Sequence, residues 1–246
     1  MVDRICIGVD GCPGGWICVV QAADGTLHAR FEAAFEEVVA CNEDAIFAVD
    51  MPIGLPDVGH GIEPGVRGCD REARRLLGFP RSTSVFSAPV RDLLEIDSGD
   101  IVRDHVEASR RSHAVSGRKV TRQTMNILPR IREVDGLLQQ RPDLRDRIFE
   151  VHPELSFRQI NGASLDAGKR SREGRAIRIG HLAELHGEQT LTQLQSRIKG
   201  TPARTEDLLD ALACLWSAER IAMGAHMTIP EHPEHDATGL PMSISC

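Results

Sequence analysis

The chain has 246 residues, of which 41% are hydrophobic and 26% are charged. This balance is typical of globular proteins and excludes disorder as the overall state. No run approaches the ~18 apolar residues of a membrane helix, so we expect no membrane contact by a spanning segment. The net charge of −7 excludes a broad electrostatic grip on duplex DNA, which requires a basic protein surface.

The cysteine pattern favours a reducing compartment. The chain has seven cysteines, an odd number, and no pair has the C-x-x-C spacing. Most lie in apolar runs, so we expect buried, reduced thiols in a cytoplasmic protein. The first residues, MVDRICIGVD, reach the polar Asp10 too early for a signal peptide, which favours the same location.

The first fifty residues predict a meander followed by a crossover. Apolar runs at 4–10, 16–21 and 26–33 are separated by turns, of which GCPGG is the first, and are typical of three antiparallel strands. A helix at 35–41 then leads to a fourth strand at 45–51. The helix between them indicates that this strand pairs in parallel with an earlier one.

Residues 56–147 fit no strand pattern and are interpreted as a largely helical insertion within one domain, 1–246. Helices are expected near 70–77, 101–112 and 124–140. Between 101 and 150 the sequence has eleven Lys and Arg against seven Asp and Glu. This basic segment is a candidate phosphate-binding lid, or only a solvated face.

The rest of the chain predicts one more sheet strand and one long helix. We expect a strand at 148–151, the clearest amphipathic helix at 204–222, and an edge strand at 240–245.

Two of the apolar runs end in a carboxylate, Asp10 in IGVD and Asp50 in AVDMP. Ligands of open α/β sheets collect outside the carboxyl ends of the strands. If the two strands are parallel neighbours, Asp10 and Asp50 lie side by side there. Two like charges so close are unfavourable unless a cation sits between them. The alternative is that each residue only caps a turn or a helix.

A second pair of acids lies near the start of the long helix, in the segment EDLLDAL. Asp207 and Asp210 are three positions apart and share one helix face, which continues through small or apolar residues and so points into the protein. For Asp207 the alternative is a favourable interaction with the helix dipole. Hard cations such as Mg²⁺ or Mn²⁺ prefer carboxylate oxygens, and two of them would clamp a phosphoryl displacement. The predicted metal ligands and catalytic carboxylates are Asp10, Asp50, Asp207 and Asp210.

Six segments carry a family resemblance: GVDGCPGGWICVV at 8–20, VDMPIGLP at 49–56, GCDREARRLLG at 68–78, SVFSAP at 84–89, EVHPELSF at 150–157 and EDLLDALACLW at 206–216. On these segments the chain resembles the predicted RNase H-like nuclease family, domain of unknown function 429. The resemblance implies an α/β fold with an RNase H-like mixed sheet, three antiparallel strands plus parallel strands, flanked by helices. It also implies divalent-metal-dependent phosphodiester hydrolysis, with Mg²⁺ or Mn²⁺ as cofactor.

A more remote resemblance concerns the acidic helix. Its pattern, Asp207-x-x-Asp210-Ala-Leu-Ala, is similar to the final acidic helix of RuvC-type junction resolvases. In those enzymes, acids on strand one, on strand four and on this helix bind the metals, which implies these roles for Asp10, Asp50, Asp207 and Asp210. One departure is Glu206, where the family often has Asp, and we expect this residue to lie outside the metal's ligands.

Glu150 and His152 form a further candidate pair. Strand positions two apart point the same way, so both side chains, and with them Glu154, are expected on one face. Glu150 would be another ligand, and His152 would move a proton. The alternative is an ordinary polar strand end before Pro153.

Two groups of basic residues are candidate substrate contacts. Arg67, Arg71 and Arg74 have helical spacing, so their guanidinium groups would hold phosphates from one face. Lys169 and Arg175 belong to a second basic stretch. For both groups the alternative is a solvated face with local ion pairs.

Other functions stay open. GVDGCPGGWICVV also resembles the first phosphate loop of actin-like ATPases and sugar kinases, which would make the protein a nucleotide-binding phosphotransferase or ATPase. A non-catalytic nucleic-acid-binding module is a third possibility. The substrate is nucleic acid or a small phosphate ester, and the oligomeric state, including a homodimer, is not determined by the sequence.

Overall fold

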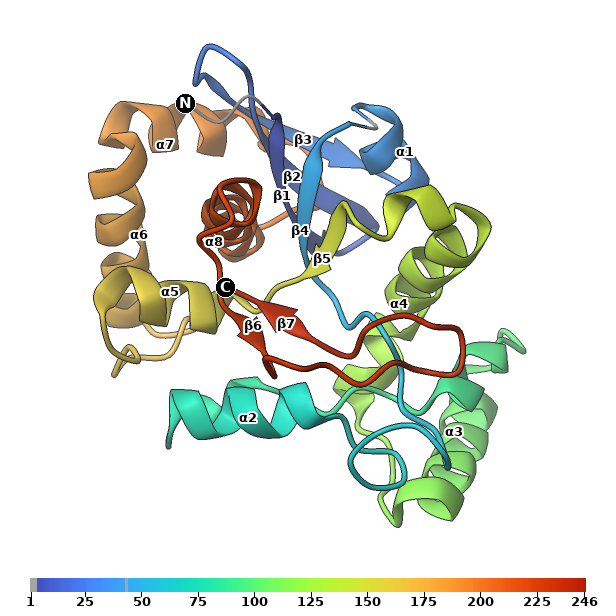
Figure 1. Ribbon diagram of the computed structural model, residues 1–246. Coiled ribbons are helices and arrows are strands. Elements are labelled where there is room, and N and C mark those ends of the chain that lie inside the picture. Colours follow the sequence, from blue (N-terminus) through green and yellow to red (C-terminus); the bar gives the residue numbers. More distant parts are fainter. Residues whose placement is uncertain (1–3, 43) are drawn as a thin grey trace.

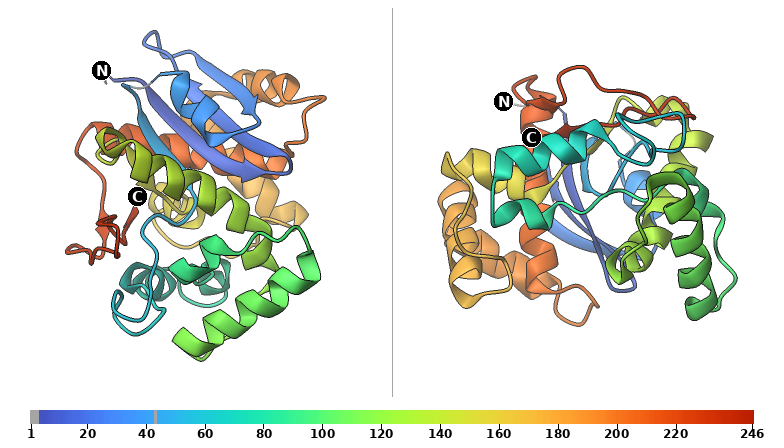
Figure 2. Two further views of the ribbon diagram at one scale, coloured as in Figure 1. Left: turned by 90° about the vertical axis from the view of Figure 1, so that its right-hand side faces the viewer. Right: turned by 90° about the horizontal axis from the view of Figure 1, so that it is seen from below.

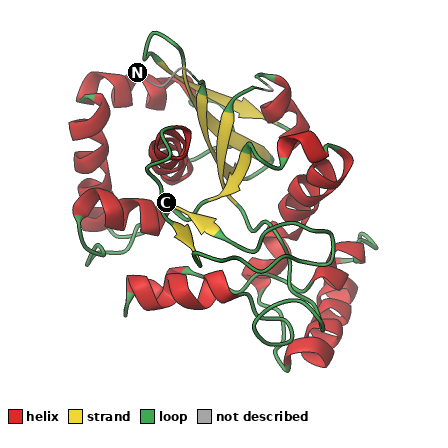
Figure 3. Ribbon diagram, in the orientation of Figure 1, coloured by secondary structure: helices red, strands yellow, loops and turns green. Residues whose placement is uncertain are grey.

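The computed structural model describes residues 4–42 and 44–246 of the chain. Within these ranges, five strands form a mixed sheet in the order β3-β2-β1-β4-β5, and helices lie on both of its faces (Figure 1; Figure 3). The strands of this sheet are β1 (Cys6–Cys12), β2 (Gly15–Gln21), β3 (Leu27–Glu32), β4 (Ile46–Asp50) and β5 (Ile148–Glu150). A second, small sheet pairs β6 (Thr228–Ile229) with β7 (Ile244–Ser245).

The expected helices at 35–41, 70–77, 101–112, 124–140 and 204–222 are present, and three further helices between 153 and 197 were not predicted. The α-helices of the described residues are α1 (Phe35–Ala40), α2 (Gly68–Leu77), α3 (Ile101–Ser116), α4 (Arg122–Gln140), α5 (Pro153–Asn161), α6 (Arg172–His186), α7 (Glu188–Arg197) and α8 (Thr205–Ala222). Short 3₁₀-helices are η1 (Arg81–Ser84), η2 (Arg91–Glu95) and η3 (Pro142–Leu144). A helix that is both long and apolar enough to cross a bilayer is absent from this described part of the chain.

The strand pairing confirms the predicted mixed sheet. β1, β2 and β3 form an antiparallel meander, and β4 pairs in parallel with both β1 and β5. The first hairpin is tighter than the expected GCPGG turn, because β1 continues to Cys12 and β2 begins at Gly15. The predicted edge strand at 240–245 is shorter, and only Ile244–Ser245 pairs as β7.

Each face of the sheet has its own apolar core. α8 packs on one face together with α5 and α6, which contact α8, and α7, which contacts β3, whereas α1 and α4 cover the other face (Figure 1). In β1 the side chains alternate, so Cys6 lies on the α8 face, whereas Ile7 and Val9 lie on the α4 face. Gly8 and Asp10 therefore belong to the face that α8 covers.

Gly8 allows α8 to approach the sheet closely. A Cβ atom on Gly8 would lie 2.1 Å from both the carbonyl oxygen of Ala211 and the backbone nitrogen of Leu215. These atoms belong to helix backbone and cannot move aside alone. We therefore expect Gly8→Ala to displace α8 and to lower the free energy of unfolding by about 1–3 kcal/mol or more.

Urea unfolding measures the effect of Gly8→Ala. Gly180→Ala in α6 is the matched control, because a Cβ there meets no atom within 4 Å. The control should be neutral or slightly stabilising, since Ala has the higher helix propensity. A Gly8→Ala protein as stable as the wild type would contradict the close approach of α8.

The segment between β4 and β5 contains the predicted helices but is not a separate outer layer. α2 and α3 lie beyond the end of the sheet, whereas α4 packs on the sheet itself (Figure 1; Figure 2). Ile131, Val134 and Leu138 of α4 are buried in the core on that face. Part of the predicted insertion therefore covers one face of the central sheet.

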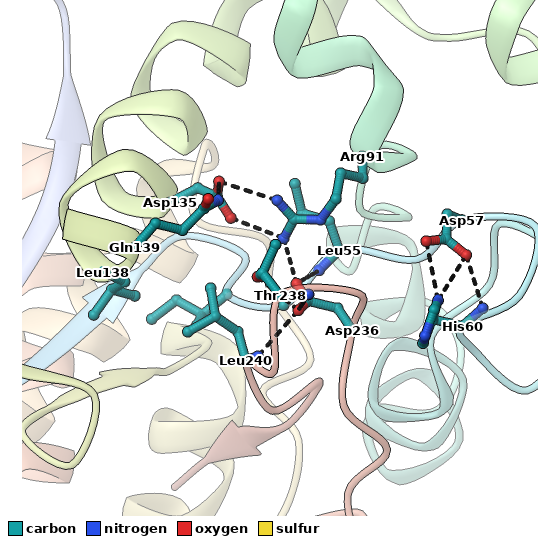
Figure 4. A network of polar contacts seen from close by, with 12 residues as sticks. Leu55, Asp57, His60, Arg91, Asp135, Leu138, Gln139, Asp236, Thr238 and Leu240 are labelled. Atoms are coloured by element: carbon teal, nitrogen blue, oxygen red, sulfur yellow. Dashed lines mark hydrogen bonds and ion pairs between the residues drawn. The ribbon is translucent and has the colours of Figure 1, made fainter. Parts of the chain in front are cut away.

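A polar cluster around Asp236 ties distant parts of the chain together (Figure 4). Arg91 donates hydrogen bonds to Asp135 of α4 and to Asp236. The carboxylate of Asp236 also accepts from the backbone N–H groups of Leu55, at 2.9 Å, and Leu240, at 3.0 Å. These contacts anchor the segment that follows Asp50.

Candidate carboxylate site at the end of the sheet

Asp10 and Asp50 lie opposite each other on neighbouring strands. The parallel register pairs Asp10 of β1 with Asp50 of β4, and adjacent strands are about 4.8 Å apart. Because paired residues point to the same side of a sheet, both carboxylates lie on the face covered by α8. The adjacency expected from strand order is therefore present.

α8 brings a third carboxylate to this place. Asp210 is buried, with 3% of its surface exposed, and its Oδ2 accepts a hydrogen bond from Nζ of Lys169 at 2.5 Å. The Lys169 side chain is 45% exposed and reaches the cluster from the loop before α6. Its ammonium group supplies positive charge to a cluster of acids.

The crowding of charges changes the acidity of the cluster. Burial and the charge of Asp50 raise the pKa of Asp10 well above its ordinary value. Burial, together with the charge of Asp210, raises the pKa of Asp50 to about 7, although Lys169 opposes the shift. Burial lowers the pKa of Lys169, but the neighbouring carboxylates more than compensate and raise it above its ordinary value.

Asp207 has features of both roles considered from the sequence, an interaction with the helix start and a place in the acidic cluster. Its Oδ2 accepts a hydrogen bond from the backbone N–H of Arg204 at 2.8 Å, so it caps the start of α8. Burial raises its pKa, and its charge contributes to the raised pKa of Asp10. Asp207 is therefore a helix cap at the border of the carboxylate cluster.

A cavity of about 350 Å³ opens beside the carboxylates. Asp50, Lys169 and Asp210 contribute to its lining, and so do His152 and Glu154 from the start of α5. The lining residues that were not predicted as site residues include Arg81, Phe86, Gln123 and Arg170. Phe86 lies in the segment SVFSAP, so the family resemblance was the available sequence signal for this side of the cavity.

His152 faces the cavity as the N-cap of α5. The backbone N–H of Glu154 donates to its Nδ1 at 3.2 Å, and its Nε2 lies 3.4 Å from the carbonyl oxygen of Ser84. A neutral ring with its proton on Nε2 satisfies both contacts. Burial lowers the pKa of His152, which favours this neutral form.

Glu150 does not join the carboxylate cluster, and the predicted common strand face does not extend to Glu154. β5 ends at Glu150 and the backbone stays extended through Val151 and His152, but Glu154 already belongs to α5 and so leaves the strand alternation. The register pairs Glu150 with Val49, whose side chain lies on the face opposite α8. Glu150 therefore points away from Asp50.

Glu150 is instead part of a buried ion pair with Arg67. The guanidinium of Arg67, 2% exposed, donates to both carboxylate oxygens of Glu150 at 2.7 Å and to Asp70 at 2.5 Å. Burial raises the pKa of Glu150 to about 7, although Arg67 opposes the shift. Arg67 precedes α2 as its N-cap and does not share an exposed face with Arg71 and Arg74.

The other predicted basic contacts lie elsewhere. The side chain of Arg71 is 65% exposed and pairs with Glu63, beside a different cavity. Arg74 donates to the carbonyl oxygen of Val85 at 2.9 Å. Arg175 pairs with Glu206 and does not line the cavity of the carboxylates. The structure therefore brings only Lys169 of the predicted basic residues to the acids.

The carboxylates fit a divalent cation by their chemistry. Within residues 4–42 and 44–246, no three His, Cys, Asp or Glu side chains already stand at a geometry that holds a metal ion. However, no described residue donates a hydrogen bond to the side chain of Asp10 or Asp50. Oε2 of Glu154 is also buried without a partner. Mg²⁺ and Mn²⁺ prefer oxygen ligands, and carboxylate oxygens that accept no hydrogen bond from the protein suit this role.

Comparison with known proteins places the chain in a family. The family model described as "Protein of unknown function (DUF429)" matches residues 8–235, from β1 to the segment after β6. No curated protein and no solved structure matches the chain. Because the family match spans most of the 246 residues, the chain belongs to the DUF429 family of proteins of unknown function.

Proposed function

We propose that the protein hydrolyses phosphodiester bonds with the help of a divalent metal ion held by its carboxylates. One observation carries the proposal: Asp10 and Asp50 lie side by side, and no described residue donates a hydrogen bond to either. Leaving two like charges in this state costs free energy in the native protein. A bound cation would remove that cost, which supports the interpretation of these carboxylates as a metal-binding site.

The proposed roles follow from position. Asp10, Asp50 and Asp210 would hold the metal ion, which supplies charge neutralisation and an activated water when it is bound. Asp207 would support them from the start of α8. His152, neutral and facing the cavity, would accept or donate a proton. Lys169 pairs with Asp210 and would orient its carboxylate toward the metal ion.

The architecture is the second support for this proposal. An RNase H-like sheet has three antiparallel strands followed by parallel strands, as the sequence resemblance implied. The strand order β3-β2-β1-β4-β5 with an acidic helix across it agrees with that arrangement. We therefore propose an RNase H-like fold, with RuvC-type resolvases as its more distant relatives and nucleic acid or a small phosphate ester as substrate.

The glycines of the first hairpin give no support to the ATPase alternative. A Cβ atom on Gly15 would lie 2.2 Å from the carbonyl oxygen of Glu32 in β3, and one on Gly14, at a φ of +80°, would meet Pro202 at 3.5 Å. Close packing and a turn with positive φ explain these glycines. Phosphate binding is not needed to account for them.

Thermal unfolding with and without Mn²⁺ tests the metal site. A ligand present at a hundred times its Kd stabilises by about 2.7 kcal/mol, which raises the Tm of a chain of this size by roughly 5–10 °C. We expect this rise for the wild type and its loss in Asp210→Asn, because the variant removes one charged ligand.

Glu206→Gln is the matched control, since Glu206 lies one turn earlier on α8 and pairs with Arg175. It should respond to Mn²⁺ like the wild type. Hydrolysis of bis(p-nitrophenyl) phosphate, followed in parallel, should require the metal and fail in Asp210→Asn. An equal response of Asp210→Asn and wild type would place the metal elsewhere or nowhere.

A further inference from the structure

The side chain of Arg81 has no hydrogen-bond or ion-pair partner among the described residues, although its Nε is buried. Its carbonyl oxygen accepts from the hydroxyl of Ser84 at 2.7 Å, so the backbone of η1 is fixed at this residue. A charged donor group in this state is costly unless something else supplies the acceptors.

Two fully buried arginines differ from Arg81 because their terminal nitrogens have a carboxylate partner, although Nε of Arg178 is also without one. Arg67 and Arg178 are 2% and 1% exposed, and each is held by a carboxylate, Glu150 and Glu154 respectively. In both cases the fold supplies the anion. For Arg81 the described chain supplies none.

The position of Arg81 indicates what the missing anion would contact. Arg81 lines the same cavity as Asp50, Lys169 and Asp210. Its terminal nitrogens lie against the backbone of Gly168, where a Cβ atom would be 3.0 Å from Nη1 and 3.3 Å from Nη2. Gly168 directly precedes Lys169, so the guanidinium group lies beside the carboxylate cluster and not on a remote surface.

We propose that Arg81 binds the phosphate group of the substrate, a phosphate ester seated in the cavity beside the carboxylates. The planar fork of an arginine matches two phosphate oxygens and forms strong, charge-assisted hydrogen bonds. Arg170 lines the same cavity and adds a third cation beside Arg81 and Lys169. A volume of about 350 Å³ lies within the usual range of small-ligand sites and accepts a group of nucleotide size.

This inference deepens the proposed function and depends on it for the chemistry at the carboxylates. The binding of an anion by Arg81 can be measured separately. The phosphate could belong to a free nucleotide or to a nucleic-acid strand, and both present the same group to Arg81.

Calorimetric titration of adenosine 5′-monophosphate and of a short single-stranded oligonucleotide tests the proposal, in Mn²⁺ and in EDTA. We expect Arg81→Ala to weaken binding by about tenfold or more, because it removes charge-assisted hydrogen bonds. Arg81→Lys keeps the charge but loses the fork, so its defect should be smaller. Gly168→Ala should also weaken binding, because its Cβ displaces the guanidinium group without changing any charge.

Arg110→Ala is the matched control: Arg110 lies on α3, its side chain is 66% exposed, and it pairs with Glu107. It should bind both probes like the wild type. Equal losses for both probes in Arg81→Ala would assign the cavity to a small ester, whereas a loss for the oligonucleotide alone would assign it to a strand. Unchanged affinity for both probes, or no binding of either by the wild type, would overturn the role of Arg81.

The rise of Tm with Mn²⁺ separates this inference from the proposed function. Arg81→Ala should retain the full rise, which also shows that the variant is folded. A wild type that lacks the rise but binds the probes through Arg81 would refute the metal site and leave the phosphate site standing.

Discussion

If the proposed function holds, replacing Asp10 by Asn abolishes the proposed phosphodiester hydrolysis without unfolding the protein. Removal of a group that only supports a metal ligand costs 10–100-fold in activity, so loss of a ligand should cost more than about 100-fold. In EDTA the variant should be as stable as the wild type or more stable. The reason is that one of two adjacent buried charges disappears.

The stability difference should depend on pH. An aspartate has a pKa of about 3.9 in the unfolded chain, whereas the pKa of Asp50 is about 7 in the native protein and that of Asp10 is also raised. The contribution of these groups to the free energy of unfolding is fully present below about pH 4. It is lost as the pH rises toward 7 and beyond. Asp10→Asn carries less of this loss, so its advantage in EDTA should grow from pH 5 to pH 8.

Melting curves at these two pH values measure the difference. Asp44→Asn is the control, because the side chain of Asp44 is 95% exposed and its pairing with Arg147 should contribute little. A large fall in the Tm of Asp10→Asn would show instead that Asp10 holds the fold together.

Replacing Arg67 by Ala should cost about 3–5 kcal/mol of unfolding free energy. The side chains of Arg67, Glu150 and Asp70 are almost fully buried, so the substitution leaves two carboxylates without their cation. The loss should be smaller near pH 5, because without Arg67 the pKa of Glu150 rises further and the group becomes neutral there. Urea unfolding at pH 5 and pH 8 measures both effects.

Two variants separate this mechanism from a general loss of packing. Arg67→Ala combined with Glu150→Gln should recover part of the stability at pH 8, since it removes one orphaned charge. Arg75→Ala, on the exposed side of α2, should stay within about 0.5 kcal/mol of the wild type. If Arg67→Ala instead kept its stability and lost phosphate affinity, Arg67 would contact substrate, as its spacing first suggested.

The strands of the sheet and the acids at their ends could be predicted from the sequence, because they depend on local patterns. Apolar runs that end in Asp10 and Asp50 predict strands with polar ends, and the helix between strands predicts parallel pairing. Together they predict that the carboxylates lie side by side if the two strands are neighbours, and the structure shows that they are. The α8 pattern similarly shows which face of the helix is buried.

The side of the sheet on which Glu150 lies could not be predicted from the sequence, because it depends on the register between β4 and β5. A shift of one residue between β4 and β5 would have moved Glu150 to the side of Asp50. The sequence contains no turn or pattern that fixes this pairing across the long segment between the strands.

The role of Arg67 and the position of Arg81 could not be predicted for a different reason. Helical spacing grouped Arg67 with Arg71 and Arg74, but Arg67 lies before the helix and reaches Glu150 on a distant strand. Arg81 meets Gly168 only after the loops that carry them have folded together. Such pairs are set by tertiary packing, which local periodicity does not contain.

The Asp236 cluster has a consequence for the order of folding. The bond from Leu55 to Asp236 joins residues 181 positions apart, so the entropy of closing this loop opposes it until the intervening chain is compact. The β1–β2–β3 meander joins neighbouring segments of the chain and is expected to form earlier. The segment after Asp50 is then expected to be among the last to be fixed, so that a refolding chain forms the meander before the carboxylate cluster is complete.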